Sequence, residues 1–424
     1  EQEAASMTLT RRMMMLTTGA SLLGGCVPNP LDGLTQAGQN FLRPTPPDLQ
    51  PTPNAGYAQW VANFKSRAEA RGIHPVTISQ AFRGTGYLPG IVTRDRNQAE
   101  FSRSFEDYLN LVASEAKVTS GRAAFTNQSR LLRRIEDQYG VPREVVAAIW
   151  GVESEFGAKR GDIPVISATS TLAYDGRRAA FFEAQLFAAL RILQQGHTTA
   201  ENLKGSWAGA MGHTQFIPTT FAAHAVDFNG DGKKDIWGID PTDALASTAA
   251  YLREGGAWQS QFGVGCEVRL PQGYSGPSGR GAPSTLATWI ARGVVPVVTP
   301  TRDLGNAALL LPAGPNGPGF LISPNFSALL RYNASDNYAL GVIYLAGRLT
   351  GAGPISTPFP PDQYGLLIED RRAIQEGLKA RGYEIGTIDG VFGRQTEAAI
   401  RAFEAETGWP ITGQPSQTLL TALR

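Results

Sequence analysis

Two glutamates at the end of an apolar stretch are the side chains best suited to chemistry. Glu153 lies in Val145–Gly157, which follows Gly140-Val141-Pro142, and a proline at this position is typical of a helix start. At helical spacing, Glu153 shares a face with apolar residues, namely Val146, Ile149, Trp150 and Phe156. Burial on that face would raise the pKa of the carboxyl, as a general acid at neutral pH requires. The alternative is a solvated glutamate at a helix end.

Glu155 is the nearest candidate for a second catalytic carboxyl. Two carboxyl groups about 5–10 Å apart can work as a catalytic pair, one as acid and the other as nucleophile or base. Residues two positions apart on a helix point in different directions, so Glu155 should not face the same bond as Glu153. We expect Glu155 to be a structural carboxylate, and a catalytic partner from elsewhere in the chain stays open.

A second cluster of oxygen-bearing side chains matches the first nine positions of an EF-hand loop. Its expected ligands are Asp227, Asn229, Asp231, the backbone carbonyl of Lys233, and Asp235. Position 12 is Gly238 instead of glutamate, so Asp243, or less favourably Asp240, would have to close the loop. Hard oxygen ligands suit a structural Ca²⁺. The alternatives are a solvated acidic turn and a Na⁺ site.

Length and composition indicate an ordinary globular protein. The 424 residues suffice for two or three domains. A net charge of +1 argues against nucleic acid as a partner and against a polybasic membrane surface. The 48 glycines and 28 prolines indicate many loops and linkers.

The first 26 residues have the features of an export segment. Arg11-Arg12 precedes Met13–Leu23, an apolar run too short to be a permanent membrane span. Leu23-Gly24-Gly25-Cys26 resembles a bacterial lipobox, which predicts lipidation of Cys26. An ordinary signal peptide with a chance cysteine is the alternative. With Cys26 lipidated, Cys266 has no disulfide partner.

Proline-rich stretches divide the rest of the chain. We expect a spacer at 27–55, a catalytic domain at 56–352, a linker at 353–364 and a small module at 365–424. Helical periodicity predicts helices near 57–72, 75–82, 101–116, 121–139, 178–195, 218–226, 242–254, 326–349, 366–381, 394–407 and 415–423. Short β-like runs at 308–312 and 319–322 predict a small β-containing subdomain within 264–325.

Four blocks in order resemble the membrane-bound lytic murein transglycosylase B family over residues 56–352. They are Gly140-Val141-Pro142 with Gly151–Gly157, then Leu203–Pro218, Ala225–Gly232 and Tyr332–Tyr338. The resemblance implies a mainly α, lysozyme-like α+β catalytic domain. It places the catalytic acid at Glu153 and substrate-binding residues at Ser206, Met211, Gln215, Tyr332, Asn333 and Tyr338.

Each of these assignments has a structural alternative. Tyr332 and Tyr338 could be packing residues, and Gln215 could be a buried amide satisfied by the backbone. His213 departs from the family, which usually has an aromatic residue there, commonly tyrosine, so a change at one sugar subsite is expected.

The resemblance also implies a mechanism that needs one carboxyl and no cofactor. Glu153 would protonate the glycosidic oxygen between N-acetylmuramic acid and N-acetylglucosamine. Its carboxylate would then take the proton of the muramic C6 hydroxyl, which closes a 1,6-anhydro ring. A hydrolytic muramidase and a non-catalytic wall-binding scaffold are the alternative functions.

The last sixty residues resemble a small three-helix peptidoglycan-binding domain, with Asp389-Gly390 as a turn. Glu404 stands where that family usually has glutamine, which puts the strength of binding in question. The expected role is a tether that raises effective concentration on glycan strands. The expected location is the periplasmic side of the outer membrane of a Gram-negative bacterium, held by the lipid anchor alone. The sequence identifies no protein partner.

Overall fold

The computed structural model describes residues 46–96 and 103–424. The predicted export segment, Cys26 and most of the proline-rich spacer lie outside these described residues. Within them, no helix combines the length and the apolar character needed to cross a bilayer. Cys266 is unpaired in this part of the chain, and burial raises the pKa of its thiol to about 12.

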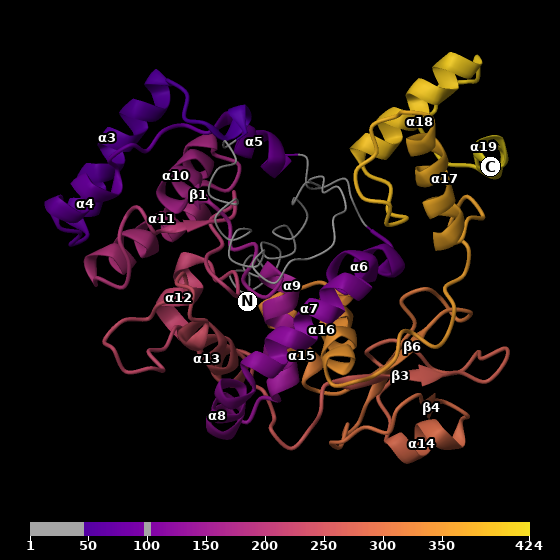
Figure 1. Cartoon of the computed structure of the whole chain (residues 1–424). Coiled ribbons are helices and arrows are strands. Elements are labelled where there is room, and N and C mark those ends of the chain that lie inside the picture. The colour runs from indigo at the N-terminus through magenta and orange to yellow at the C-terminus, as the bar shows by residue number, and fades with distance from the viewer. Residues whose placement is uncertain (1–45, 97–102) are drawn as a thin grey trace.

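The catalytic region is a helical assembly around one large apolar core (Figure 1). Its first half contains η2 (Pro47–Leu49), α3 (Ala55–Ala70), α4 (Pro75–Ala81), α5 (Pro89–Arg96), α6 (Phe105–Val112), α7 (Glu115–Asn127), α8 (Ser129–Tyr139), α9 (Arg143–Ser154), β1 (Ile163–Pro164), α10 (Val165–Asp175) and α11 (Ala179–Gln194). Its second half contains β2 (Lys204–Gly205), α12 (Pro218–His224), α13 (Thr242–Ala250) with the π-helical turn η4 (Tyr251–Gly255), α15 (Phe326–Tyr332) and α16 (Asp336–Leu349). β1 and β2 form a short antiparallel pair.

Three expected helices differ from the prediction by a break. The predicted helix at 326–349 is divided between α15 and α16, because Asn333 has an extended backbone with φ of −148°. The predicted helix at 101–116 is α6, which ends at Ala113, where φ is −141° and the helical pattern stops. The predicted helix at 121–139 is divided between α7 and α8, because the chain leaves helical geometry at Gln128, the C-cap of α7. Shorter helices allow α6, α7 and α8 to pack on α9 or α16 at different angles.

The small β-containing subdomain is present where the sequence predicts it. Its antiparallel sheet has the order β4-β3-β6-β5, with β3 (Gly265–Arg269), β4 (Val295–Pro296), β5 (Ala308–Leu310) and β6 (Gly319–Ile322). The helix α14 (Leu286–Ala291) packs on it through Trp289, whose Nε1 donates to the Ala307 carbonyl at 2.8 Å. Val268, Leu309 and Leu321 complete this separate apolar core.

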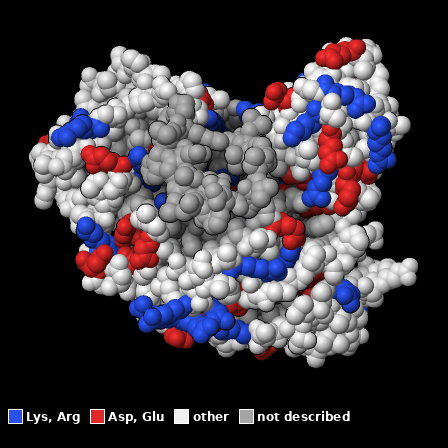
Figure 2. Space-filling view, viewed as in Figure 1, with Lys and Arg blue, Asp and Glu red and all other residues white. Residues whose placement is uncertain are grey.

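The C-terminal module is a three-helix unit with its own core, as predicted. It consists of α17 (Ile368–Ala380), α18 (Arg394–Thr407) and α19 (Gln417–Leu423), which bury Ile374, Leu378, Ile400 and Leu420 between them. Side chains of both charge signs are mixed over the visible face of the protein, this module included (Figure 2). That mixture agrees with the near-zero net charge of the sequence.

Candidate active site

Glu153 lies in the last turn of α9 and is half-buried. The helix buries every residue from Val145 to Gly151, so its final turn is anchored in the core. Directly after Glu153 the chain turns sharply, because Glu155 and Phe156 adopt left-handed φ values of 51° and 57°. Such values are strained for residues other than glycine and concentrate at functional sites.

The predicted helical position of Phe156 is wrong, because α9 ends two residues before it. The left-handed turn folds Phe156 back, and its ring packs edge-on against Trp150 with centroids 5.6 Å apart. Phe156 therefore packs against the last turns of α9 and does not continue the apolar face of that helix.

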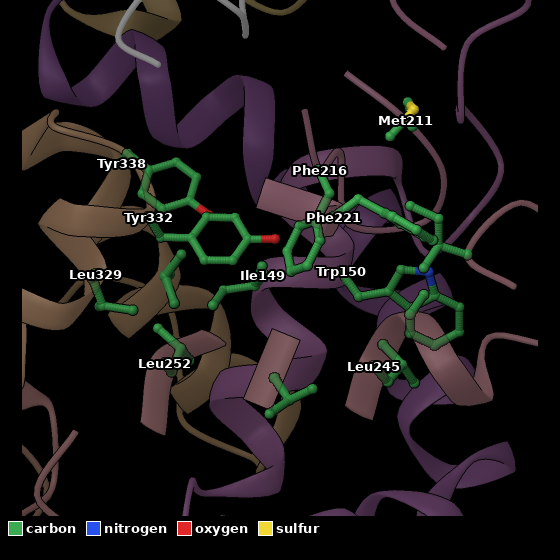
Figure 3. Packing of buried hydrophobic residues seen from close by; sticks show 14 of the residues in the cluster. Ile149, Trp150, Met211, Phe216, Phe221, Leu245, Leu252, Leu329, Tyr332 and Tyr338 are labelled. Carbon is green, nitrogen blue, oxygen red and sulfur yellow. The ribbon is translucent and has the colours of Figure 1, made fainter. Parts of the chain in front are cut away.

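Tyr338 contacts Glu153 directly. Its hydroxyl donates a hydrogen bond to Oε1 of Glu153 at 2.9 Å. The ring is fully buried and stacks on Tyr332, with centroids 6.2 Å apart and planes 6° from parallel. Figure 3 shows the two rings side by side, with their hydroxyl groups pointing the same way. Tyr332 in turn donates to the Thr214 carbonyl at 2.6 Å.

Tyr108, on α6, is a buried tyrosine whose ring lies against Gly341, one turn of α16 from Tyr338, and sequence reasoning did not single it out. Burial, together with the negative charge of Glu153, raises the pKa of its phenol well above the usual value. Its position in α6 indicated an apolar-facing residue, but no sequence signal separated it from other buried tyrosines. The acid thus accepts from one phenol of α16, and the buried phenol of α6 packs on the same helix.

The sequence left two roles open for Gln215, a substrate-binding residue and a buried amide satisfied by the backbone, and the structure has features of both. Its Nε2 donates to the carbonyls of Arg160 (3.0 Å) and Gly212 (2.9 Å), so the amide hydrogens are satisfied by backbone. Its own φ is 54°, a strained value held by those contacts. Because both N–H groups are used, the carbonyl Oε1 is the atom through which Gln215 could recognise a ligand.

Asn333 follows Tyr332 at the end of α15 and is 4% exposed. Its buried Oδ1 has no hydrogen-bond partner among the described residues. An unsatisfied buried acceptor is costly unless a donor from a ligand or water completes it. This orphan oxygen supports the predicted contact of Asn333 with substrate.

Ser206 and Met211 shape the loop that leads to Gln215. Ser206 is half-buried, and its Oγ accepts from the Ala210 N–H at 3.1 Å. Met211 exchanges two backbone hydrogen bonds with Phe216, and its side chain is fully buried. The structure therefore places Met211 in the core, at the edge of the cluster in Figure 3.

Glu155 is held away from catalysis by two lysines. Its Oε1 lies 2.8 Å from the Nζ atoms of both Lys117 and Lys159. Partial burial alone would raise the pKa of Glu155, but the hydrogen bonds from the two lysines outweigh it and lower the pKa overall. A carboxyl with a lowered pKa and two fixed cations is unsuited to donate a proton.

His213 lies behind Trp150 and is 2% exposed, so the expected change at a sugar subsite is wrong. The Trp150 indole N–H donates to Nδ1 at 3.1 Å, and Nε2 lies 2.8 Å from the Gly238 carbonyl. Indole nitrogen can only donate, so Nδ1 is the acceptor and Nε2 carries the proton. Burial lowers the pKa of His213 to about 4, which keeps this ring neutral.

Asp243 joins the two ends of the acidic loop through backbone hydrogen bonds. Oδ1 of Asp243 accepts from the Phe228 N–H (2.8 Å), and Oδ2 accepts from the Asp235 N–H (2.9 Å). Asp240 instead caps α13 through Thr242. Within the loop, the oxygens of Asp227, Asn229, Asp231 and Asp235 accept further backbone N–H groups, including that of Lys233.

The donor set of this loop suits a hard cation, although its carboxylates do not converge. No group of three or more His, Cys, Asp or Glu side chains within residues 46–96 and 103–424 is arranged to hold a metal. Burial and the charge of Asp227 nevertheless raise the pKa of Asp243, whose backbone hydrogen bonds oppose the shift. A bound cation would relieve this unfavourable concentration of negative charge.

Comparison with known families decides the identity of the fold around this site. Residues 56–347 match the transglycosylase SLT domain, and residues 368–423 match a peptidoglycan binding domain. The chain belongs to the transglycosylase SLT family. It is 35% identical over 232 residues to membrane-bound lytic murein transglycosylase B of Escherichia coli (strain K12), covering 53% of this chain and 62% of that enzyme. Less than two thirds of the E. coli enzyme is therefore represented.

Solved structures extend the similarity to most of the chain. SltB3 from Pseudomonas aeruginosa, in complex with NAG-NAM-pentapeptide, is 44% identical, with a TM-score of 0.68 over 88% of this chain and 100% of SltB3. The same protein has been solved with NAG-anhNAM-pentapeptide. Slt35 from Escherichia coli, in complex with calcium, is 27% identical with a TM-score of 0.58, covering 73% of this chain and 98% of Slt35. The predicted family, fold class and enzyme class, a lytic murein transglycosylase, are confirmed.

Proposed function

We propose that Glu153 is the single acid and base of a peptidoglycan lytic transglycosylase that cleaves the MurNAc-(β1,4)-GlcNAc bond without water. The observation that carries this proposal is the 2.9 Å hydrogen bond from the Tyr338 hydroxyl to Oε1 of Glu153. Tyr338 donates to Oε1, so the acidic proton belongs on Oε2. Partial negative charge at the C-terminal end of α9 also favours the uncharged carboxyl.

The reaction has two proton transfers that balance. Glu153 first donates its proton to the leaving O4 of N-acetylglucosamine, while the substrate's own N-acetyl oxygen stabilises the positive charge developing at C1. The carboxylate then removes the proton of the muramic C6 hydroxyl, whose oxygen bonds to C1. Glu153 ends protonated, and the attack is favoured because it is intramolecular.

The surrounding polar groups would orient the sugar. The Gln215 Oε1, the buried Asn333 Oδ1 and the Ser206 hydroxyl would contact N-acetyl and hydroxyl groups of the substrate. Tyr332 and Met211 are buried and would act by supporting Tyr338 and the Gln215 loop. The two-lysine environment of Glu155 supports a mechanism that uses one carboxyl.

Mass spectrometry of products from purified sacculi tests this function. Anhydromuropeptides are expected, because ring closure releases no reducing end. Products heavier by one water would instead identify a hydrolytic muramidase. Glu153→Gln should fold normally and release no products, and cleavage by this variant would refute the assignment.

Failure of the wild-type enzyme to cleave sacculi would favour the scaffold alternative. The complex of SltB3 with NAG-anhNAM-pentapeptide supports the anhydro product.

We also propose that the Asp227–Asp243 loop binds a structural Ca²⁺ through oxygens of Asp227, Asn229, Asp231, Lys233, Asp235 and Asp243. The support is the oxygen-rich donor set, the unfavourable burial of Asp243, and calcium in the related Slt35. Millimolar Ca²⁺ should raise the melting temperature relative to chelator, and Asp231→Asn should reduce the rise. An unchanged melting temperature, or equal stabilisation by Na⁺ at matched ionic strength, would contradict a calcium site.

The C-terminal module would bind peptidoglycan through its own surface. A hollow of 490 Å³ is lined by Trp409, Gln417, Thr418, Thr421 and Ala422. Trp409 is supported edge-on by Phe403, with centroids 5.7 Å apart, so its indole has a fixed position from which to stack on a ligand. Trp409→Ala should weaken retention on sacculi without changing cleavage of soluble fragments.

Lipid anchoring at Cys26 is the proposed location signal, with attachment to the outer membrane facing the periplasm. It is supported by the Leu23–Cys26 pattern and by the membrane-bound relative. Metabolic labelling with a fatty-acid analogue should mark the wild-type protein and not Cys26→Ser. Labelling of both proteins would contradict lipidation at this cysteine.

A further inference from the structure

The eight-residue helix α6 is used on two opposite faces. Its inward face buries Phe105, Tyr108, Leu109 and Val112. Its outward face carries the polar residues Glu106, Asp107 and Asn110. Helical periodicity separates the two sets, so contacts on one face can constrain the other.

The inward face reaches the catalytic glutamate. Gly341, on α16, has no side chain, and a Cβ added there would lie 2.7 Å from the Tyr108 ring. This close approach occurs one helical turn from Tyr338, the residue that donates to Glu153. Tyr108 is 7% exposed, so its ring has little room to move relative to α16. A shift of α6 would therefore change the surroundings of the acid.

The outward face is held by the peptidoglycan-binding module. Arg371, on α17, is 5% exposed, and its guanidinium pairs with Glu106 and with Asp107, the latter at 2.5 Å. The next residue, Arg372, donates to the Asn110 Oδ1 at 3.2 Å. Figure 1 shows α17 next to α6, with α9 and α16 beyond it. One planar guanidinium thus binds two carboxylates of the first turn of α6.

The linker before the module is anchored as well. Oε1 of Glu267, on β3, accepts from both the N–H and the hydroxyl of Ser356 at 2.8 Å. Further along, the Phe359 ring lies against Phe105 of α6, with centroids 6.1 Å apart. The module therefore has a defined position on the catalytic region, and the expectation of a simple tether is incomplete.

We propose that Arg371 is a positioning residue for the transglycosylase reaction. It clamps α6 so that Tyr108 stays packed on α16 at Gly341, one helical turn from the tyrosine that donates to Glu153. The peptidoglycan-binding module then contributes to turnover by setting the geometry of the acid, in addition to retaining the enzyme on the wall. This inference rests on the proposed role of Glu153. Small displacements at a reacting group can lower the rate by about a hundredfold, so the clamp can have a large effect.

The test compares full-length variants on a soluble, uncross-linked glycan fragment and on sacculi. Arg371→Met should lower kcat by about tenfold to a hundredfold, with KM for the soluble fragment and retention on sacculi changed less than about twofold. Arg371→Lys keeps the charge but loses the two-pronged geometry, so it should recover part of kcat. The matched control is Arg424→Met, which removes the Arg424–Asp370 ion pair within the module and does not touch α6.

A second variant keeps the test decisive if Arg371→Met does not fold. The triple change Glu106→Gln, Asp107→Asn and Arg371→Met removes the clamp without leaving a buried charge unpaired. It should unfold cooperatively and show the same loss of kcat. Normal kcat in either folded variant, or a defect confined to retention on sacculi, would overturn the inference. Reducing ends in wild-type products would refute the proposed transglycosylase chemistry. They would not refute the role of Arg371, which is measured separately by the ratio of kcat between the variant and wild type.

Discussion

Tyr338 donates a hydrogen bond to Glu153 across 185 positions of sequence. The two residues come from α16 and α9, the helices that form the centre of the catalytic core. Because Tyr338 is fully buried and stacked on Tyr332, its hydroxyl has little freedom to move from the carboxyl. The acid is thus oriented by the core itself.

Tyr338→Phe should keep the fold and lower kcat by about tenfold to a hundredfold, because the hydrogen bond strengthens as Glu153 gives up its proton and becomes a charged carboxylate. The change removes one oxygen and leaves the aromatic stack intact. Steady-state rates on a soluble fragment measure the loss. Tyr344→Phe, on the same helix, removes a hydroxyl that contacts Arg348 instead of Glu153 and is the control. Equal rates in both variants would show that the hydrogen bond does not orient the acid.

Glu155→Gln should remain active, in contrast to Glu153→Gln. The variant loses two partly exposed ion pairs, to Lys117 and Lys159, each worth less than about 1 kcal/mol. Since the folded-state pKa of Glu155 is lowered, the stabilisation exists above its unfolded pKa and is lost as the pH falls through the folded value. Denaturant unfolding and product release measure the two effects. Loss of cleavage in folded Glu155→Gln would make this residue a second catalytic carboxyl.

His213 should make the folded state acid-sensitive. Its pKa is lowered from 6.5 to about 4, so between these values the unfolded chain binds a proton that the folded chain excludes. Stability is therefore complete above about pH 6.5 and falls by about 3 kcal/mol on acidification to about pH 4. The proton would enter at Nδ1, where it would face the N–H of Trp150.

The matched variant is His213→Gln, whose amide can accept from Trp150 and donate to Gly238 without titrating. Urea unfolding at several pH values should show that the free energy of unfolding falls less for the variant than for wild type between about pH 6.5 and about pH 4. Identical pH dependence in the variant and in wild type would show that His213 does not cause the acid sensitivity.

Glu404→Gln should destabilise the C-terminal module without strengthening its binding. The Glu404 carboxylate is 5% exposed and accepts from the Thr412 N–H and hydroxyl and from the Gly413 N–H, at 2.6–2.7 Å. Glutamine would present N–H groups to some of these donors, at a cost of about 1–3 kcal/mol. Hydrogen exchange at Thr412 and Gly413 should accelerate. Unchanged exchange would mean that the loop does not depend on this carboxylate.

Burial alone would raise the pKa of Glu404, but these hydrogen bonds lower it overall. The stabilisation from the ionised group therefore exists above its unfolded pKa and is lost as the pH falls through the lowered folded value. Because its oxygens are used within the module, we expect Glu404 to have a structural role there.

Helices with one apolar face were predictable from the sequence. Their apolar residues recur with the helical period, and this pattern can be recognised without knowing which elements pack against the helix. The helix α11 and the three helices of the module are examples. In contrast, α10 was missed, since every residue from Val165 to Ala173 is buried and the segment shows no polar face. The breaks at Ala113 and Gln128 depend on packing against other helices. The local sequence pattern holds no information about that packing.

The amino-acid sequence by itself determined the family and the position of the oxygen-rich loop, and it predicted Glu153 as the acid, because ordered motifs with fixed spacing record local chemistry. Only the tertiary structure decided which groups surround that acid. It brought Tyr338 to Glu153 from a helix 185 positions away in sequence, and it enclosed Glu155 between two lysines. It also placed Arg371 of the C-terminal module on α6, a contact that depends on how two separate cores dock.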